Sequence, residues 1–221
     1  MTVKKIIKGL TMVELFSGSG IISKEFQNLG FKIFQIDIRE RKSVCEPNLK
    51  KDILQVRLSD IPFKKVDIIW ASPPCDIFSK ASSNFHIDKL GNPKTEKALE
   101  HLKILKKTLI LIEKINPTYF FIENPSGKMK FNRDMIRFLI RNNAMIKQLD
   151  YICYGFELRK PTNIFTNMLG INFKNLSGKK QNLSKDKPSK IFNNLSKCQR
   201  QKIPKLLAVE VANYCKEVFL K

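Results

Sequence analysis

The chain is poor in acidic residues. Its 20 Asp and Glu stand against 41 Lys and Arg in 221 residues, which leaves a formal net charge of +21. So large an excess of positive charge favours a polyanion as the partner, and nucleic acid first. The amino-acid usage of an A/T-rich genome is the alternative explanation, because lysine, isoleucine and asparagine are all abundant. Charge therefore predicts a class of partner and says nothing of a reaction.

Paired cysteines are also lacking. The five cysteines are odd in number and none stands in a Cys-x-x-Cys pair. The two histidines, His86 and His101, do not have the spacing of a metal pair. We therefore expect neither a disulfide scaffold nor a metal site, and we expect a reducing, cytoplasmic compartment.

Long apolar runs are absent as well. No run approaches the roughly 18 residues of a membrane-spanning helix, and residues 1–10 are too short and too charged for the core of a signal peptide. We expect no transmembrane helix and no membrane partner. With 43% hydrophobic residues, the chain can nevertheless bury the core of one α/β domain.

The start of the chain predicts one βαβ unit. Residues 11–16 are rich in β-forming residues, 21–29 read as a helix closed by Gly30, and 31–36 alternate apolar and polar residues before Asp37. The further expected elements are strands over 51–55, 66–71, 118–122, 148–154 and 162–168 and helices over 95–115 and 132–141. This order predicts an α/β, Rossmann-like fold with a mostly parallel sheet and an antiparallel closing hairpin.

Composition divides the chain into three parts. Residues 1–170 carry the predicted sheet, 171–202 are dominated by Lys, Asn, Ser and Gln, and 203–221 form an amphipathic helix. We interpret the middle part as a basic linker or a minimal nucleic-acid-contacting arm. The last helix is expected to pack back on the sheet. Residues 76–94 lack periodicity, so we expect a long mobile loop, a feature that is more often functional than idle.

Four predicted strands end in polar or conformationally special residues. In an open α/β sheet, ligands bind beyond the carboxyl ends of the strands. The four ends are Phe16-Ser17-Gly18-Ser19-Gly20, Asp37, Ser72-Pro73-Pro74-Cys75 and Glu123-Asn124-Pro125. Their convergence on one edge predicts a single pocket there.

The first two of these ends predict a nucleoside site. Gly18 and Gly20 let the backbone approach a ligand closely, and the helix that follows presents free amide donors. Asp37 can accept hydrogen bonds from both hydroxyls of a ribose. The third glycine of the dinucleotide fingerprint is missing, so a nucleoside without phosphates, S-adenosylmethionine above all, fits better. The alternative is the same fold with no cofactor.

The other two ends carry a thiol and a carboxyl. Cys75 follows two prolines on a stiff turn, where a cysteine is either a nucleophile or a small buried hydrophobe. Glu123 follows a hydrophobic strand, so its carboxyl is partly desolvated, which favours the neutral form and suits a group that donates or shares a proton. The alternative is a structural carboxylate that holds a loop amide.

In order and rough spacing, residues 11–167 resemble the DNA cytosine-5 methyltransferase family, and best its small phage-type members, which lack a large target-recognition domain. The motifs are Phe16-Ser17-Gly18-Ser19-Gly20, Ser72-Pro73-Pro74-Cys75, Glu123-Asn124-Pro125, Tyr154-Gly155 and Arg159-Lys160-Pro161-Thr162. The resemblance implies an S-adenosylmethionine-dependent methyltransferase fold, with 1–170 as the catalytic domain. It also implies an enzyme that methylates carbon 5 of cytosine in DNA.

Roles for individual residues come from the same resemblance. Cys75 would attack carbon 6 of a flipped-out cytosine, Glu123 would bind the N3 and amine edge, and Arg159 or Lys160 would contact the base carbonyl or hold the site. The loop over 76–94 would act as a lid. The residues implied to contact S-adenosylmethionine are Phe16, Ser17, Gly18, Gly20, Asp37, Ile38, Asp52, Ile53 and Pro74.

The resemblance also bears on partners and cell type. It implies double-stranded DNA, a bacterial or phage-infected cell and a possible restriction-modification role. Asp76 replaces the usual glutamine after the cysteine, the last glycine-asparagine motif is not visible, and about 35 residues between Met168 and Ile203 replace the recognition domain. A separate specificity partner is therefore possible. The oligomeric state is left open.

Three alternatives stay open at this stage. One is an RNA cytosine-5 methyltransferase of the same fold, since nothing in the sequence reads the 2′-hydroxyl. Another is a weak or inactive nucleic-acid-binding relic of the fold, although binding alone would require neither Cys75 nor Glu123. An amino-methyltransferase is disfavoured, because Cys75 stands where those enzymes carry a tyrosine and a thiol cannot stack on a flipped adenine.

Overall fold

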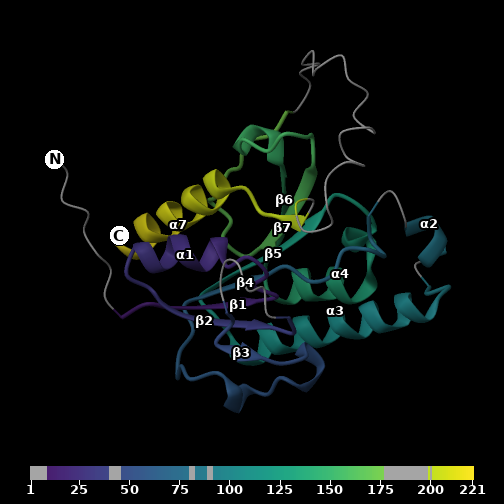
Figure 1. The fold of residues 1–221 in the computed structure, drawn as a ribbon, viewed down its shortest axis with the longest axis horizontal. Coiled ribbons are helices and arrows are strands. Elements are labelled where there is room, and N and C mark those ends of the chain that lie inside the picture. The colour runs from purple at the N-terminus through teal and green to yellow at the C-terminus, as the bar shows by residue number, and fades with distance from the viewer. Residues whose placement is uncertain (1–8, 40–45, 80–82, 89–91, 177–198, 200) are drawn as a thin grey trace.

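In a computed structural model, residues 9–39, 46–79, 83–88, 92–176, 199 and 201–221 are described. They form a seven-stranded sheet of order β3-β2-β1-β4-β5-β7-β6 (Figure 1). Strands β1 to β5 are parallel, and β7 runs antiparallel to both of its neighbours. The strands are β1 Thr11–Leu15, β2 Lys32–Asp37, β3 Leu49–Lys50, β4 Ile68–Ala71, β5 Tyr119–Pro125, β6 Met145–Asp150 and β7 Pro161–Thr166. The predicted fold class is confirmed.

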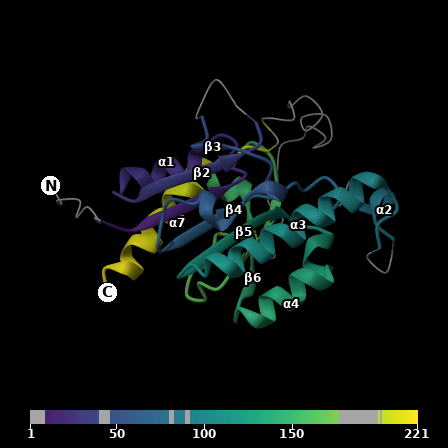
Figure 2. The ribbon, with the colours of Figure 1, turned by 90° about the horizontal axis from the view of Figure 1, so that it is seen from below.

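Helices cover both faces of the sheet. The α-helices are α1 Ile21–Asn28, α2 Ser83–His86, α3 Glu96–Ile115, α4 Arg133–Arg141 and α7 Lys205–Phe219, and the 3-10 turns are η1 Ile53–Gln55, η2 Leu58–Asp60, η3 Lys128–Phe131 and η4 Tyr151–Tyr154. Helices α1 and α7 pack side by side on one face, and α3 and α4 lie on the other (Figures 1 and 2). The three layers leave the carboxyl ends of the parallel strands at one open edge, where ligands of such sheets bind.

The alternation of β1 shows how the sequence divides the core. Val13 and Leu15 belong to the hydrophobic cluster under α3 and α4, whereas Met12 belongs to the cluster under α1 and α7. Successive strand residues point to opposite faces, so one apolar strand feeds both layers. Each fully buried side chain of this size contributes about 1.5–3 kcal/mol.

Two long helices begin at the residues that the sequence indicates. Thr95 precedes α3 and its hydroxyl accepts a hydrogen bond from the Ala98 amide at 3.2 Å. Asn132 precedes α4 and its side-chain oxygen accepts from the Met135 amide at 3.1 Å. Such caps satisfy amides that the first turn leaves without partners. The C-terminal helix also packs back on the sheet as expected, through buried residues such as Leu207.

Two predicted strands have the wrong bounds. The strand expected over 51–55 is instead β3, Leu49–Lys50, and a 3-10 turn follows it because the Asp52 carboxylate caps the Leu54 amide at 2.9 Å. The strand expected over 148–154 is β6, which ends at Asp150. Residues 151–154 form η4, which Gly155 closes at a φ of 80°.

The expectation of a structureless loop over 76–94 is wrong for its described residues. Ile77 and Phe78 are buried in the core, Ser79 bridges Gly127, and Ile87 bridges Pro93 around the short helix α2. Residues 80–82 and 89–91 lie outside the described part. The predicted arm over 171–202 also falls mostly outside it.

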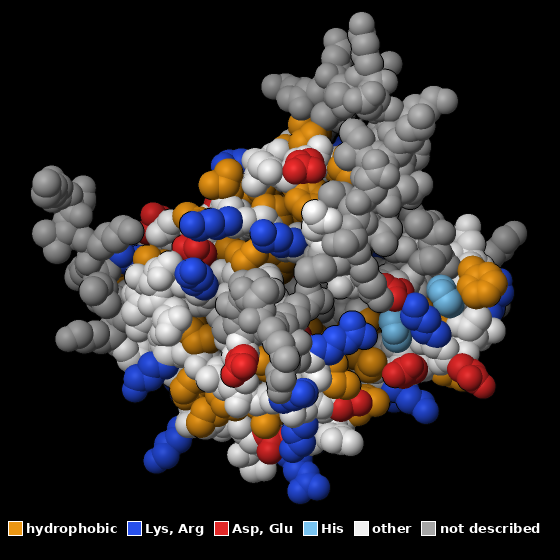
Figure 3. All heavy atoms as spheres, in the orientation of Figure 1, with side chains coloured by type: hydrophobic (Ala, Val, Ile, Leu, Met, Phe, Trp, Pro, Cys, Tyr) orange, Lys and Arg blue, Asp and Glu red, His pale blue; other side chains and the backbone are white. Residues whose placement is uncertain are grey.

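The surface agrees with the high net charge. Figure 3 shows Lys and Arg side chains spread over the described part of one face, with acidic side chains between them. Positive charge is therefore distributed over this face and does not gather in one patch. No helix in the described part of the chain combines the length and apolar character needed to cross a bilayer.

Candidate active site

The turn that carries Cys75 is held by the strands on both sides of it. The Ser72 amide donates to Leu15 O of β1 at 3.2 Å, and Asn124 Nδ2 of β5 donates to Pro73 O at 3.3 Å. Beyond the turn, the Phe78 amide donates to Cys75 O at 2.9 Å. These bonds tie the turn to β1 and β5 and close it on itself after the cysteine. The thiol is free and half-buried at the open edge of the sheet.

The surroundings of Cys75 disfavour its thiolate in the protein alone. Burial raises the pKa of the Cys75 thiol to about 11, and the nearby Glu123 carboxylate adds to this rise. The charge of Lys160 acts in the opposite direction and lowers the pKa. The thiol is therefore protonated at neutral pH. A nucleophilic role requires the sulfur to lose its proton when substrate is present.

Glu123 is buried near the end of β5 and has a specific partner. Its Oε1 accepts a hydrogen bond of 2.9 Å from the hydroxyl of Tyr151, the first residue of η4. Tyr151 is fully buried, and this burial, reinforced by Glu123, raises the pKa of the phenol well above its ordinary value. Tyr151 thus remains a hydrogen-bond donor at all ordinary pH values. Sequence reasoning missed this residue.

Tyr154, in the family-like Tyr-Gly segment, has a different task. Its hydroxyl donates to Glu210 of α7 at 2.7 Å and accepts from the Lys174 amide at 2.9 Å. It therefore links the β6–β7 hairpin to the C-terminal helix. The two tyrosines of η4 therefore contact different parts of the protein. Tyr151 bonds the carboxyl of Glu123, and Tyr154 bonds the C-terminal helix α7.

Arg159 and Lys160 point to different partners. Arg159 Nε donates to Oδ2 of the buried Asp150 at 2.8 Å, and the Lys160 amide donates to Asp150 Oδ1 at 2.9 Å. Lys160 Nζ lies 4.4 Å from the centroid of the Tyr151 ring, and its charge reaches Cys75. Of the two adjacent cations, Lys160 is thus the one that acts electrostatically on the thiol.

The glycine turn after β1 is wound by left-handed residues. Phe16, Gly18 and Gly20 have φ values of 60°, 53° and 64°. A phenylalanine in this region is uncommon, and such outliers gather at functional sites. The turn is fixed at its centre, where the Gly18 amide donates to Asp37 Oδ2 at 2.8 Å. Ser17, beside it, is buried.

Asp37 has acceptor capacity left for a nucleoside. Its Oδ2 accepts from Gly18, and its Oδ1 accepts from the Arg39 amide at 2.9 Å. Each carboxylate oxygen has two acceptor sites, so both can still receive a ribose hydroxyl. Ile38, next in the chain, is 56% exposed and offers apolar surface to a flat ring. This edge therefore fits an adenosyl group.

The remaining predicted cofactor residues lie near this edge with unequal access. Asp52 is half-buried, and its carboxylate already caps η1. Ile53 is buried in the core, so its side chain offers little surface to a ligand. Pro74 is half-buried beside Cys75. Among the described residues, no group of three His, Cys, Asp or Glu side chains is placed to hold a metal ion.

Glu14 lies behind the glycine turn and was also missed by sequence reasoning. It is buried on β1, where its Oε2 accepts hydrogen bonds from the Ser23 hydroxyl, from the Ser23 amide at 3.2 Å and from Gln35 Nε2 at 3.3 Å. Burial raises the pKa of Glu14 to about 7. The carboxyl joins α1 and β2 beneath the turn that Gly18 forms.

The sheet order, the glycine turn and the thiol beyond the carboxyl end of β4 are features of the fold that S-adenosylmethionine-dependent methyltransferases share. Residues 10–159 match the C-5 cytosine-specific DNA methylase family, and the chain belongs to that family.

Two curated relatives extend the match. The type II methyltransferase M.FnuDI of Fusobacterium nucleatum is 28% identical over 160 residues, which cover 66% of this chain and 43% of the relative. A frog virus 3 protein described as a probable DNA (cytosine-5)-methyltransferase is 26% identical over 178 residues, which cover 77% of this chain and 76% of the relative. The chain thus spans less than half of M.FnuDI.

Solved structures show the same fold. The Entamoeba histolytica methyltransferase EhMeth superposes with a TM-score of 0.52 at 20% identity, over 72% of this chain and 53% of that chain. Dnmt2 of S. pombe gives a TM-score of 0.52 at 18% identity, over 75% and 53%. Both are about twice as long as the part that matches.

Proposed function

We propose that the chain transfers a methyl group from S-adenosylmethionine to carbon 5 of cytosine in DNA, through a covalent bond between Cys75 and carbon 6. The observation that carries this proposal is that Cys75 and Glu123 come together at the open edge of the sheet. Asn124, next to Glu123, bonds Pro73 O in the turn before Cys75, and Tyr151 holds the Glu123 carboxyl. A structural thiol would need neither a buried carboxyl nor a cation such as Lys160 beside it. Family membership supports the same reaction.

Cys75 supplies the activation that the cytosine ring needs. Carbon 5 of an aromatic cytosine is a poor nucleophile. The Cys75 sulfur loses its proton and bonds to carbon 6, which breaks the aromaticity and moves electron density to carbon 5. S-adenosylmethionine, when bound, would supply an electrophilic methyl group, which bonds to carbon 5 as the sulfur–methyl bond breaks and S-adenosylhomocysteine leaves. A base then removes the carbon 5 proton, and the sulfur–carbon 6 bond breaks to release the thiolate.

Glu123 stabilises the adduct by binding the base edge. Addition at carbon 6 makes N3 more basic, and a carboxyl beside N3 can share a proton with it. The bond from Tyr151 holds one oxygen of that carboxyl in place. Lys160 favours the thiolate that attacks, because its charge lowers the pKa of Cys75. Arg159, bonded to Asp150, would hold the hairpin that carries Lys160.

The glycine turn and Asp37 would hold the cofactor. Asp37 would accept the ribose hydroxyls while it keeps Gly18 in position, and Ile38, which is exposed, would flank the adenine ring. Phe16 would pack on the adenine, Gly18 and Gly20 would approach the methionine part, and Ser17 would contact the cofactor beside them. Asp52 would contact the adenine amino group with Ile53 beside it, and Pro74 would contact the cofactor next to Cys75.

The half-buried position of Cys75 requires an unstacked base. The thiol lies at the sheet edge, and carbon 6 of a stacked cytosine cannot reach it, so the target base must be flipped out. Double-stranded DNA is the proposed substrate, with residues 171–202 as a basic contact to the backbone. A restriction-modification role in a bacterial or phage-infected cell, and a separate specificity partner, belong to the same proposal.

The proposal is tested by following label from S-adenosylmethionine into nucleic acid. Wild-type protein is expected to label DNA, and Cys75→Ser is expected to lose the label entirely. DNA containing 5-fluorocytosine should form a covalent adduct that maps to Cys75, because the fluorine blocks the final proton loss. Label in RNA alone would favour the RNA alternative. If neither DNA nor RNA receives label that depends on Cys75, the methyl-transfer proposal is rejected in favour of a nucleic-acid-binding relic of the fold.

A further inference from the structure

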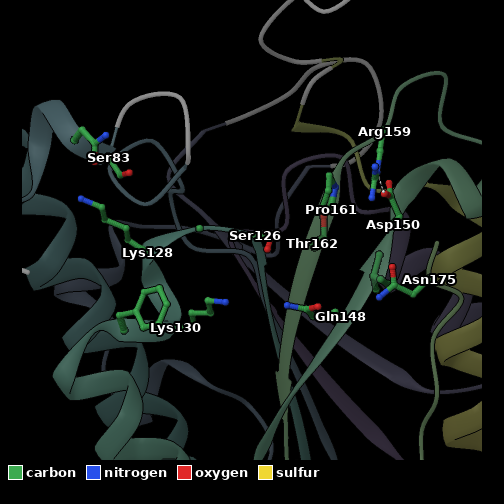
Figure 4. A pocket seen from close by; sticks show the side chains of 14 residues that line it. Ser83, Ser126, Lys128, Lys130, Gln148, Asp150, Arg159, Pro161, Thr162 and Asn175 are labelled. Carbon is green, nitrogen blue, oxygen red and sulfur yellow. Dashed lines mark hydrogen bonds and ion pairs between the residues drawn. The ribbon is translucent and has the colours of Figure 1, made fainter. Parts of the chain in front are cut away.

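A basic cavity of about 550 Å³ opens between η3 and the β6–β7 hairpin (Figure 4). Lys128 and Lys130 stand on one wall, and Arg159 stands on the other. Asp150 is the one acidic side chain among the described residues of the lining, and it is buried and paired with Arg159. The cavity therefore suits an anionic group, and its volume suits a small ligand or a single nucleotide.

The cavity adjoins the candidate catalytic edge. Strand β5 ends at Pro125, two residues past Glu123, and Ser126, the next residue, lines the cavity. Thr162, another lining residue, pairs with Pro125 across β5 and β7. At about 3.3 Å per residue, Ser126 lies on the order of 10 Å along the strand from Glu123. A nucleic-acid strand that delivers a base to Glu123 must place a neighbouring nucleotide near this cavity.

An exposed aromatic ring lies on the basic wall. Phe131 lines the cavity and is 68% exposed, and Lys130 Nζ lies 4.9 Å from its ring centroid. An exposed phenyl face is an unfavourable surface in water but stacks well on a nucleobase. At the end of η3, the ring of Phe131, which can stack on a base, thus lies next to the ammonium of Lys130, which can bind a phosphate.

The segment that contains α2 is joined to the wall that carries Lys128 (Figure 4). Ser83 and Asn84 of α2 line the cavity, and Lys128 Nζ donates to Ile87 O at 3.3 Å. Backbone pairing of Ser79 with Gly127 adds a second link. The segment after Cys75 and the segment after Glu123 therefore both line this cavity.

We propose that this cavity holds the nucleotide next to the target cytosine on the same strand, with its phosphate on Lys130 and its base stacked on Phe131. This inference rests on the proposed function, because it takes the cytosine to lie at Cys75 and Glu123. A base stacked on Phe131 has left the duplex stack. The chain therefore favours cytosine whose neighbour is unpaired over cytosine in a fully paired duplex.

Binding by the Cys75→Ser protein tests the cavity without methyl transfer. Phe131→Ala is compared with Ile140→Ala, a control on α4 whose side chain is 75% exposed. The probes are two fluorescently labelled duplexes of one sequence. One is fully paired, the other has mismatches beside the cytosines, and binding to each is measured by fluorescence anisotropy. Phe131→Ala is expected to weaken binding to the mismatched duplex by roughly ten- to a hundredfold, and the control is expected to leave it unchanged.

The phosphate contact is tested separately with salt. Lys130→Gln should reduce the slope of log affinity against log salt by about 0.9, whereas Lys103→Gln on α3 should keep the slope of the parent. Melting temperatures check that each variant is folded. The cavity proposal is overturned if Phe131→Ala and Ile140→Ala bind the mismatched duplex with equal affinity. It is also overturned if the parent protein binds the paired duplex as tightly as the mismatched one. If Phe131 governs binding but wild-type protein transfers no methyl group, the nucleotide site stands and the proposed reaction falls.

Discussion

The hydroxyl of Tyr151 lies 2.9 Å from Oε1 of Glu123 and donates a hydrogen bond to it. The donor comes from the turn after β6 and the acceptor from the end of β5, so the bond crosses the strand β7 that lies between them. It fixes one carboxyl oxygen and leaves the other with its acceptor capacity. The carboxyl proposed to bind cytosine is thereby oriented before substrate arrives, which is how preorganised sites reduce the cost of the reaction.

Tyr151→Phe should reduce turnover more than substrate binding. The change deletes one hydroxyl and leaves a buried carboxyl oxygen without its donor, at a cost of about 1–3 kcal/mol. We expect kcat to fall by roughly five- to a hundredfold, with little change in KM for S-adenosylmethionine. Tyr154→Phe is the matched control, because its hydroxyl bonds Glu210 on α7. Steady-state kinetics and urea unfolding of both variants check the prediction, and equal loss of kcat in the two would contradict it.

The reactivity of Cys75 should respond to its two charged neighbours in opposite directions. Burial and Glu123 raise the pKa of the thiol to about 11, and Lys160 lowers it. Glu123→Gln should therefore lower the pKa and speed alkylation of Cys75 at neutral pH, and Lys160→Gln should slow it. The rate is measured by mass spectrometry of the Cys75 peptide over a pH series. Glu210→Gln is the control, and the same rate in all four proteins would refute the electrostatic contact.

Glu14 should make stability depend on pH near neutrality. Its pKa is raised by burial from 4.5 to about 7 in the folded protein. The folded state then holds its proton more tightly, so this contribution to stability is complete below pH 4.5 and is lost as the pH rises through 7. Glu14→Gln should remove the loss, with a gain on the order of 1–3 kcal/mol above pH 7 relative to wild type. Urea unfolding on both sides of pH 7 measures it, and parallel pH profiles of the two proteins would contradict it.

Gly127 should tolerate no side chain. A Cβ at this position would lie 2.0 Å from Phe78 O, which is backbone and part of the segment that follows Cys75. Gly127→Ala must displace that segment, so we expect a loss of about 1–3 kcal/mol in unfolding free energy together with a lower kcat. Gly170→Ala is the control, because its Cβ would meet only the mobile hydroxyl end of Tyr214. A smaller effect at Gly127 than at Gly170 would show that the two segments are not coupled.

The residues that end the parallel strands could be predicted from the sequence, and their partners could not. Hydrophobic runs and turn residues indicate that Asp37, Cys75 and Glu123 end strands, and parallel strands bring such ends to one edge. The partnership of Tyr151 with Glu123 depends on the register of β5 against β7 and on the 3-10 turn of η4. Neither follows from periodicity, because the sequence around residue 151 is equally compatible with a continuing strand.

A similar limit applies to β3 and to the adjacent cations. The capping bond of Asp52 converts an expected strand into a turn, and such local side-chain bonds compete with strand pairing. The division of labour between Arg159 and Lys160 is decided by Asp150, which binds the guanidinium of one and the backbone amide of the other. Which of two adjacent cations faces the thiol depends on a shift of one residue in the loop, and neither composition nor motif spacing indicates such a shift.

The position of β7 between β5 and β6 has a consequence for how the protein is made. Phe121 pairs with Thr166, so the strand that carries Glu123 obtains its outer neighbour only after the chain has been synthesised past that threonine. Pairings between distant residues form slowly. A nascent chain can therefore contain Cys75 and Glu123 before Tyr151 is held in place beside the Glu123 carboxyl. The orientation of that carboxyl is completed only when the closing hairpin joins the sheet.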